Sequence, residues 1–118
     1  DAMLRWHVDA NEVMLFRYSA LTFNGHRIHY DLPYSTDVEG HAGLLVHGPL
    51  QATLMLNIAC TKAGQTPGRM DYRGIRPLVC GAPIMVDCNP DLETSEGNLV
   101  TLVRGADGNI TMQAKVSF

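Results

Sequence analysis

Apolar residues recur at spacings of three and four most clearly in the segment that follows Gly48-Pro49. Proline suits the first turn of a helix, because its missing N–H would have no intrahelical acceptor there. The pattern predicts a helix over residues 48–63, ended by Gly64 and by Pro67 three residues further on. Most other positions of this segment are apolar too, so we expect the helix to be buried on nearly all sides.

Segments rich in strand-forming residues lie on both sides of this helix. Residues 13–18 read Val-Met-Leu-Phe-Arg-Tyr and predict a first strand that ends at Ser19. Four further strands are expected over residues 70–75, 83–87, 98–104 and 109–118, with turns at Gly81, Asn89-Pro90 and Asp107-Gly108. The turn sequence Asp107-Gly108-Asn109 between two alternating runs predicts a hairpin.

Residues 19–42 follow neither the helical nor the strand period, and they contain three of the five histidines. This pattern predicts a long ordered loop with short turns, and loops of that length in small domains are usually functional. One strand, one buried helix and about four antiparallel strands together predict an α+β domain. Its antiparallel sheet would curve around the helix.

Composition narrows the class of protein. The 118 residues suit one domain, covering residues 1–118, with a globular share of 46% hydrophobic residues. Nine basic against twelve acidic residues give a net charge of -3, and no basic run is present that would bind a row of phosphates. We therefore expect no nucleic-acid partner. No apolar run approaches the roughly 18 residues of a membrane span, so we expect no membrane partner either.

The three cysteines, Cys60, Cys80 and Cys88, are odd in number and lack the close spacing of metal ligands. This usage is typical of reduced thiols in the cytoplasm or the mitochondrial matrix. No signal pattern opens the chain, which agrees with a cytoplasmic location. The sequence predicts no metal site.

The strongest candidate chemistry lies in residues 22–31, Thr-Phe-Asn-Gly-His-Arg-Ile-His-Tyr-Asp, and in His47-Gly48-Pro49-Leu50 at the head of the predicted helix. A helix N-terminus offers unpaired N–H groups and a partial positive charge, so it can receive negative charge that develops on a carbonyl oxygen. A histidine close by can exchange a proton near neutral pH.

Residues 19–31 and 46–54 resemble the MaoC-like, hot-dog-fold acyl-thioester hydratases, in particular the branch that includes the mesaconyl-CoA and itaconyl-CoA hydratases. The family signature is Asp-x-Asn-Pro-hydrophobic-His-x-Asp/Glu. In this register its histidine corresponds to His29 and its trailing acidic residue to Asp31. Its leading aspartate corresponds to Asn24, its asparagine to His26 and its proline to Arg27.

The resemblance implies hydration of an α,β-unsaturated acyl-CoA, or dehydration of a 3-hydroxyacyl-CoA, without a metal or redox cofactor. His29 would exchange the proton between water and the α-carbon, and the Gly48 amide would bind the thioester oxygen. Asn24 departs from the family pattern, because an amide cannot take a proton from water as a carboxylate can. We interpret Asn24 as a residue that orients the water in a modified but active site.

Several neighbouring residues are candidates for substrate binding, and each of them also has a simpler structural interpretation. His26 either takes part in the chemistry or supports it from the loop, and His47 either contacts the substrate or, more simply, packs in the turn before Gly48. Asp31 is slightly better explained as a turn-capping residue.

Two arginines suit the second carboxylate of a dicarboxylic acyl group such as mesaconyl-CoA or itaconyl-CoA. Arg27 or Arg17 would bind it through a bidentate pair, although an ion pair with Asp31 or Asp37 would account for either arginine. Tyr34 and Tyr18 are candidates to line the acyl pocket, or they fill gaps in the packing.

Hot-dog domains usually act in pairs, so the resemblance implies a homodimer, or one half of a double hot-dog protein that docks onto a second such domain. Two other functions stay open. An acyl-CoA thioesterase would need a carboxylate facing the thioester, whereas the helix carries Gln51 and Asn57 there. A non-catalytic acyl-CoA-binding or pairing domain would tolerate the absence of an aspartate at position 24.

Overall fold

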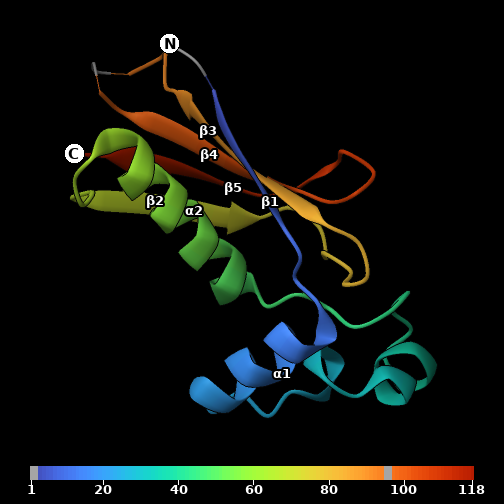
Figure 1. Ribbon diagram of the computed structural model, residues 1–118. Helices are drawn as coiled ribbons and strands as arrows, with labels where there is room; N and C mark the ends of the chain where they lie inside the picture. The colour runs from blue at the N-terminus through green and yellow to red at the C-terminus, as the bar shows by residue number, and fades with distance from the viewer. Residues whose placement is uncertain (1–2, 95–96) are drawn as a thin grey trace.

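The computed structural model describes residues 3–94 and 97–118 (Figure 1). The elements follow in the order β1 (Leu4–Val8), α1 (Glu12–Leu21), the 3₁₀ helix η1 (Arg27–His29), the π-helical turn η2 (Tyr34–Val38), α2 (Gly48–Ala63), β2 (Arg69–Gly74), β3 (Ile84–Pro90), β4 (Leu99–Arg104) and β5 (Ile110–Ser117).

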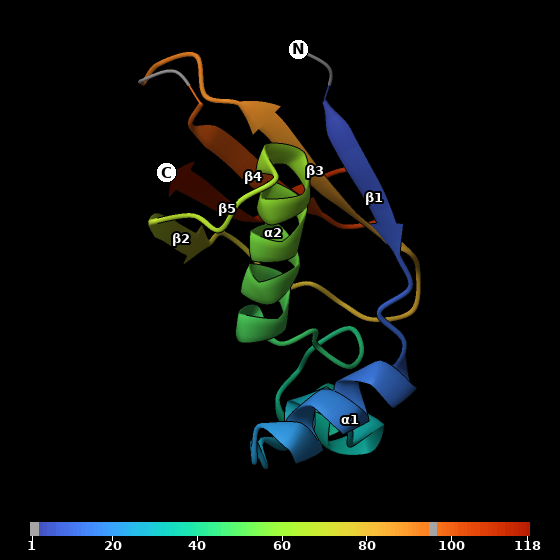
Figure 2. The ribbon, with the colours of Figure 1, turned by 60° about the vertical axis from the view of Figure 1, so that its left-hand side comes forward.

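The strands form one antiparallel sheet in the order β1-β3-β4-β5-β2. Helix α2 lies across one face of this sheet in both views (Figures 1 and 2). Alternate residues of the two central strands are buried in the core with α2, among them Val86 and Cys88 of β3 and Val103 of β4. This period of two is what a sheet covered on one face requires. The α+β hot-dog architecture expected from the sequence is confirmed.

Helix α2 has the predicted bounds, residues 48–63. His47 is its N-cap, Pro49 lies in its first turn, and Gly64 ends it in the left-handed conformation at φ 72°. The expected burial on nearly all sides is wrong. One stripe of the helix is exposed, formed by Pro49, Thr53, Leu56, Asn57 and Thr61. The sheet covers α2 on one side only, and the described residues form no second layer on the other side.

The first part of the chain differs most from the prediction. Residues 13–18 belong to helix α1, not to a strand. Asn11 begins this helix, and its Oδ1 accepts the N–H of Met14 at 2.9 Å. Strand formers such as Val13 and Phe16 are compatible with a helix when no neighbouring strand is available to pair with them. The strand β1 was not predicted; its half-buried residues Leu4, Trp6 and Val8 pair along β3.

The later strands are confirmed with small shifts at their ends, and β4 and β5 form the expected hairpin. The turn expected at Asn89-Pro90 is wrong, because both residues belong to β3 and pair with β4. Its loop spans residues 105–109, closed by hydrogen bonds from Gly105 N to Asn109 O and from Gly108 N to Gly105 O. Residues 19–42, predicted as an ordered loop, contain the end of α1 and the two short helical turns η1 and η2. Together with α1 they lie beyond the N-terminal end of α2 (Figures 1 and 2).

Candidate active site

Leu45 and Val46 form a short segment that leads into α2 and packs beside η1. Leu45 N donates to Ile28 O at 2.9 Å, and on the other side Val46 N donates to Leu78 O at 2.8 Å. This segment therefore lies between the turn that carries His29 and the residues that precede β3. His47 follows immediately and begins α2. The chain thus brings residues 29 and 47 together, although they are far apart in sequence.

Two buried histidine rings form the centre of the site. The rings of His29 and His47 are stacked, with centroids 3.7 Å apart and an interplanar angle of 18°. His29 Nδ1 donates to the Leu45 carbonyl at 2.7 Å. The carbonyl can only accept, so Nδ1 carries a hydrogen and the second nitrogen, Nε2, is the one that can gain or lose a proton.

Both rings are held in the neutral form. Burial lowers the pKa of His47 to about 4, and the neighbouring His29 lowers it further. Burial also lowers the pKa of His29, although the hydrogen bond to Leu45 opposes this shift. At neutral pH, His29 is therefore available to accept a proton at Nε2.

The structure supplies a residue that sequence analysis missed. Ser19 Oγ and His47 Nε2 share a hydrogen bond of 2.7 Å, and both side chains are buried. The Tyr18 ring meets the His47 ring edge-on at 4.7 Å. Nothing in the local sequence signals this contact, because Ser19 lies 28 residues before its partner and was expected to end a strand.

Asn24 is placed by the end of α1. Its backbone N–H donates to Ser19 O at 2.8 Å, and its side-chain Oδ1 accepts from His26 N at 3.0 Å. The His26 ring lies 6.0 Å from the His29 ring. Asn24 is half-buried and lines a surface hollow of about 350 Å³ together with Ser19, Gly25, Phe16, Ala20, Phe23 and Tyr30. The structure therefore joins Asn24, His26 and His29 in one region.

Gly48 is the first residue of α2 and directly follows His47. The first N–H groups of a helix have no intrahelical acceptor, and the helix dipole adds a partial positive charge at this end. The Gly48 amide is therefore suited to bind an oxyanion at the end of α2 where the two histidines are stacked.

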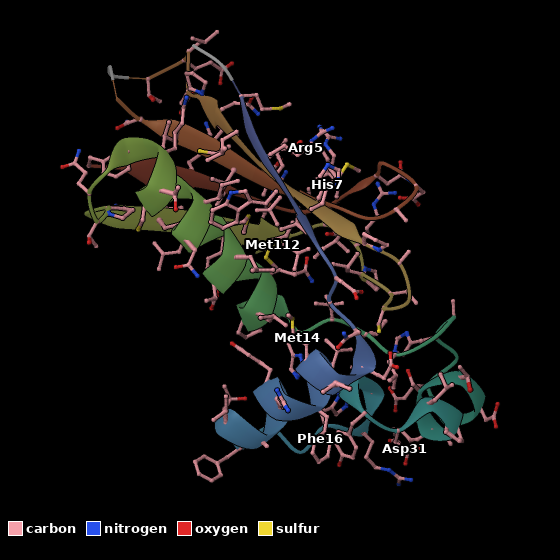
Figure 3. The ribbon with its side chains drawn as sticks, viewed as in Figure 1. Arg5, His7, Met14, Phe16, Asp31 and Met112 are labelled. Carbon is pink, nitrogen blue, oxygen red and sulfur yellow. The ribbon has the colours of Figure 1, made fainter. Side chains whose placement is uncertain are left out.

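Three of the predicted binding residues, Arg27, Asp31 and Tyr34, form a separate cluster near the surface. Arg27 pairs with Asp31 at 2.7 Å and lies over the Tyr34 ring at 4.2 Å. The Arg27 hydrogen bond holds the pKa of the Asp31 carboxyl below its usual range. Tyr34 Oη donates to Glu39 at 3.1 Å. Asp31 lies at the α1 end of the molecule, as does Phe16 (Figure 3).

The remaining candidates lie elsewhere. Arg17 lines a hollow along α1 with Tyr18 and apolar residues. Gln51 is buried: its Nε2 donates to Val46 O, and its Oε1 accepts from the Thr111 hydroxyl. Within residues 3–94 and 97–118, no three His, Cys, Asp or Glu side chains come together as a metal site would need.

This topology, an antiparallel sheet with α2 across one face, is that of a hot-dog domain. Residues 1–80 match the sequence profile of hydroxyacyl-thioester dehydratase type 2. The chain belongs to this family. It is 40% identical over 104 residues to the mesaconyl-C(4)-CoA hydratase of Chloroflexus aurantiacus. That match covers 87% of this chain and 35% of the relative, so this chain spans about a third of the hydratase's length.

Solved structures share the fold at low identity. The (R)-hydratase of A. caviae involved in PHA biosynthesis superposes with a TM-score of 0.84 at 14% identity, covering 98% of this chain and 91% of that one. The ChsH1-ChsH2 complex of Mycobacterium tuberculosis matches with a TM-score of 0.80 at 14% identity, covering 98% of this chain and 92% of that chain. The second structure is a hot-dog protein paired with another subunit.

Among the described residues, no helix has the length and apolar character to cross a membrane.

Proposed function

We propose that this domain adds water to the double bond of an α,β-unsaturated acyl-CoA, or removes water from the corresponding 3-hydroxyacyl-CoA. One observation carries the proposal: the Leu45 carbonyl occupies His29 Nδ1, which leaves a neutral, proton-accepting Nε2 at the N-terminal end of α2. The reaction class is supported by family membership and by the similarity to a mesaconyl-C(4)-CoA hydratase.

In the hydration direction, His29 Nε2 takes a proton from water as the water oxygen bonds to the β-carbon. The electrons of the carbon–carbon double bond move toward the thioester oxygen, and the Gly48 amide stabilises the resulting negative charge. The imidazolium then returns the proton to the α-carbon. One molecule of water is added, and His29 ends in its starting form.

In this proposal Asn24 orients the water and takes no proton. Its Oδ1 accepts from His26 N and retains a second lone pair for a water hydrogen. The hollow that Asn24 lines is large enough for a short acyl group, although neither His29 nor Gly48 is among its lining residues. We propose a branched or dicarboxylic acyl-CoA as substrate, with Arg27 or Arg17 as the carboxylate partner. For Arg27 this requires release from Asp31, which reduces its suitability.

The proposed assembly is a homodimer, or a pair with a second hot-dog domain. It is supported by exposed apolar side chains on α1, namely those of Val13, Phe16 and Leu21. A cytoplasmic or mitochondrial-matrix location completes the proposal, supported by three cysteines that are all free thiols.

The test is to incubate the protein with crotonyl-CoA, mesaconyl-CoA and itaconyl-CoA and to follow the loss of enoyl-thioester absorbance. We expect His29→Ala to lower the hydration rate by at least about a hundredfold, because it removes the only proposed proton carrier. Asn24→Ala should lower the hydration rate strongly. Asn24→Asp should keep the wild-type rate or raise it. Circular dichroism checks that each variant is folded.

Each other outcome rejects hydration by this site. Wild-type rates in His29→Ala would remove the assigned role of this residue. Release of free CoA without loss of the double bond would identify a thioesterase. Binding of acyl-CoA with no turnover would identify a non-catalytic domain.

A further inference from the structure

His47 has no role in the reaction proposed above, although it is a completely buried polar ring. It is enclosed by three contacts, two from adjacent residues of α1 and one from η1. Its ring is stacked on His29 at 3.7 Å, and the Tyr18 ring meets it edge-on at 4.7 Å. The third contact is the hydrogen bond with Ser19. His47 therefore cannot contact a substrate directly.

These contacts fix the orientation of both histidine rings. The Ser19 hydroxyl at 2.7 Å determines the direction in which His47 Nε2 points, and so the rotation of that ring. Because the two rings are nearly parallel, the His47 ring in turn limits the rotation of His29. The Leu45 carbonyl holds His29 at one nitrogen, and His47 holds it across its face.

Stability alone does not account for a histidine here. His47 Nδ1 is buried and has no hydrogen-bond partner within residues 3–94 and 97–118. An unpaired buried nitrogen destabilises the folded state, and apolar side chains in place of both His47 and Ser19 would avoid that penalty. A histidine at position 47 differs from an apolar ring in one respect: its Nε2 forms a hydrogen bond with Ser19.

We propose that His47 is a positioning residue: anchored to Ser19 through Nε2, its ring holds His29 in the orientation that presents Nε2 to the substrate. The catalytic consequence rests on the proposed function, whereas the orientation of His29 does not. The titratable groups near the pair are His26, 6.0 Å from His29, and Tyr18, in contact with His47.

The pair also keeps the two rings in different roles. The pKa of His47, about 4, leaves it neutral near pH 7, so it does not compete with His29 for the proton. A neutral stacked ring also shields His29 from water, in agreement with the lowered pKa of His29, for which burial is the main cause.

The experiment compares His47→Ala and Ser19→Ala with a matched control, Ser35→Ala. Ser35 is also a buried serine, but its hydroxyl donates to Gly43 O at 2.7 Å and does not touch either histidine. The measurements are kcat and KM with the enoyl-CoA that the wild type hydrates, the pH dependence of kcat, and titration of the His29 imidazole by NMR.

We expect both test variants to lower kcat about tenfold to a hundredfold, with KM changed less than about twofold, because bound substrate meets a misoriented base. The pKa of His29 should rise toward its ordinary value as water reaches the ring. His47→Gln, whose side-chain amide can still reach Ser19, should recover part of the activity lost in His47→Ala. Ser35→Ala should change neither kcat nor the His29 titration.

Folded Ser19→Ala and His47→Ala proteins with wild-type kcat and an unchanged His29 titration would overturn the inference. If His47→Ala does not fold, the kcat and the His29 titration of Ser19→Ala alone test the inference. If the wild type hydrates no enoyl-CoA, the proposed function fails, and the NMR titration still tests the positioning: a shifted His29 pKa supports it, and an unshifted one rejects it.

Discussion

Hydrogen bonds to neighbouring oxygens decide which nitrogen of each buried histidine can act. Leu45 O occupies Nδ1 of His29, and Ser19 Oγ occupies Nε2 of His47. The family motif singles out His29 as the candidate proton carrier, but it does not specify the reacting nitrogen. That choice depends on a carbonyl from a segment 16 residues further along the chain.

A second buried polar residue stabilises the opposite face of the sheet. Asp87 of β3 is 1% exposed, and its neighbours Val86 and Cys88 point into the core on the α2 side. Arg5 on β1, labelled in Figure 3, donates to Asp87 at 2.6 and 2.8 Å. Arg104 on β4 adds a bond at 3.2 Å. The Arg5 hydrogen bonds hold the pKa of the Asp87 carboxyl below its usual range.

We predict that Asp87→Asn lowers the free energy of unfolding at pH 7 by about 2 kcal/mol, because two guanidinium groups lose their carboxylate partner. Both arginines reach solvent, which keeps the loss below that of a fully buried pair. A depressed pKa stabilises the folded state at pH values above the ordinary value of about 3.9, and this contribution is lost as the pH falls through the folded-state pKa.

Urea unfolding at pH 7 and pH 3 measures the effect, and the difference between wild type and Asp87→Asn should shrink at pH 3. Asp71→Asn is the matched control, because Asp71 forms an exposed ion pair with Arg69 and should change stability by less than about 0.5 kcal/mol. Equal effects of the two substitutions at pH 7 would contradict the prediction.

At the scale of elements, the two helices end in the same left-handed conformation with different residues. Gly64 ends α2 at φ 72°, and Phe23 follows α1 at φ 54°. Phe23 N donates to Ala20 O and Asn24 N to Ser19 O, the two hydrogen bonds of a Schellman motif. This ending turns the chain back so that Asn24 lies next to Ser19. The strained conformation is thus built into the candidate site.

We predict that Phe23→Gly raises the free energy of unfolding by about 1 kcal/mol, because glycine adopts this conformation without the steric cost of a side chain. Phe23 is 96% exposed, so its removal uncovers little buried surface. Gly64→Ala should produce the opposite change, since open space surrounds Gly64 and only backbone strain is added. Thermal unfolding followed by circular dichroism measures both. A destabilised Phe23→Gly would show that its ring packs in a way that outweighs the strain.

At the scale of the whole molecule, the chain is elongated. Its radius of gyration is 14.9 Å and its extents are 47 × 29 × 20 Å. A compact domain of this length has a radius of gyration of about 13.5 Å. The extra length arises because α1 and the short helices lie beyond one end of α2, away from the sheet (Figure 2). Apolar side chains at this end, including Phe16 and Leu21, are more than half exposed.

We predict that sedimentation velocity finds a homodimer of this chain, because burying these side chains in a second copy removes apolar surface from water. A Phe16→Ser, Leu21→Ser double variant should shift the equilibrium toward monomer. Leu92→Ser is the control, since Leu92 is 92% exposed after β3 and away from α1. A wild-type protein that is monomeric at all concentrations would contradict the homodimer. If Leu92→Ser weakened the dimer as much as the double variant does, the location of the interface at α1 would be contradicted.

The sequence by itself determined α2 and the hairpin of β4 and β5. In these segments the apolar period matches the surface that becomes buried, and turn or cap residues such as Gly64 and Gly108 lie at the ends. The family motif was enough to single out His29 and Gly48 as candidates. The same local signals misassigned residues 13–18, because valine and phenylalanine suit a strand only when another strand is present to pair with it.

Only the tertiary structure decided how the site is built. The contacts of His47 with Ser19 and with His29 join residues 28 and 18 positions apart in the chain. Neither contact has a local pattern, because each depends on α1 packing beside the turn that precedes α2. Burial and hydrogen-bond direction, which set the pKa of His29 and leave its Nε2 free, arise from the same packing. They are properties of the folded chain, since an unfolded histidine has water on both nitrogens.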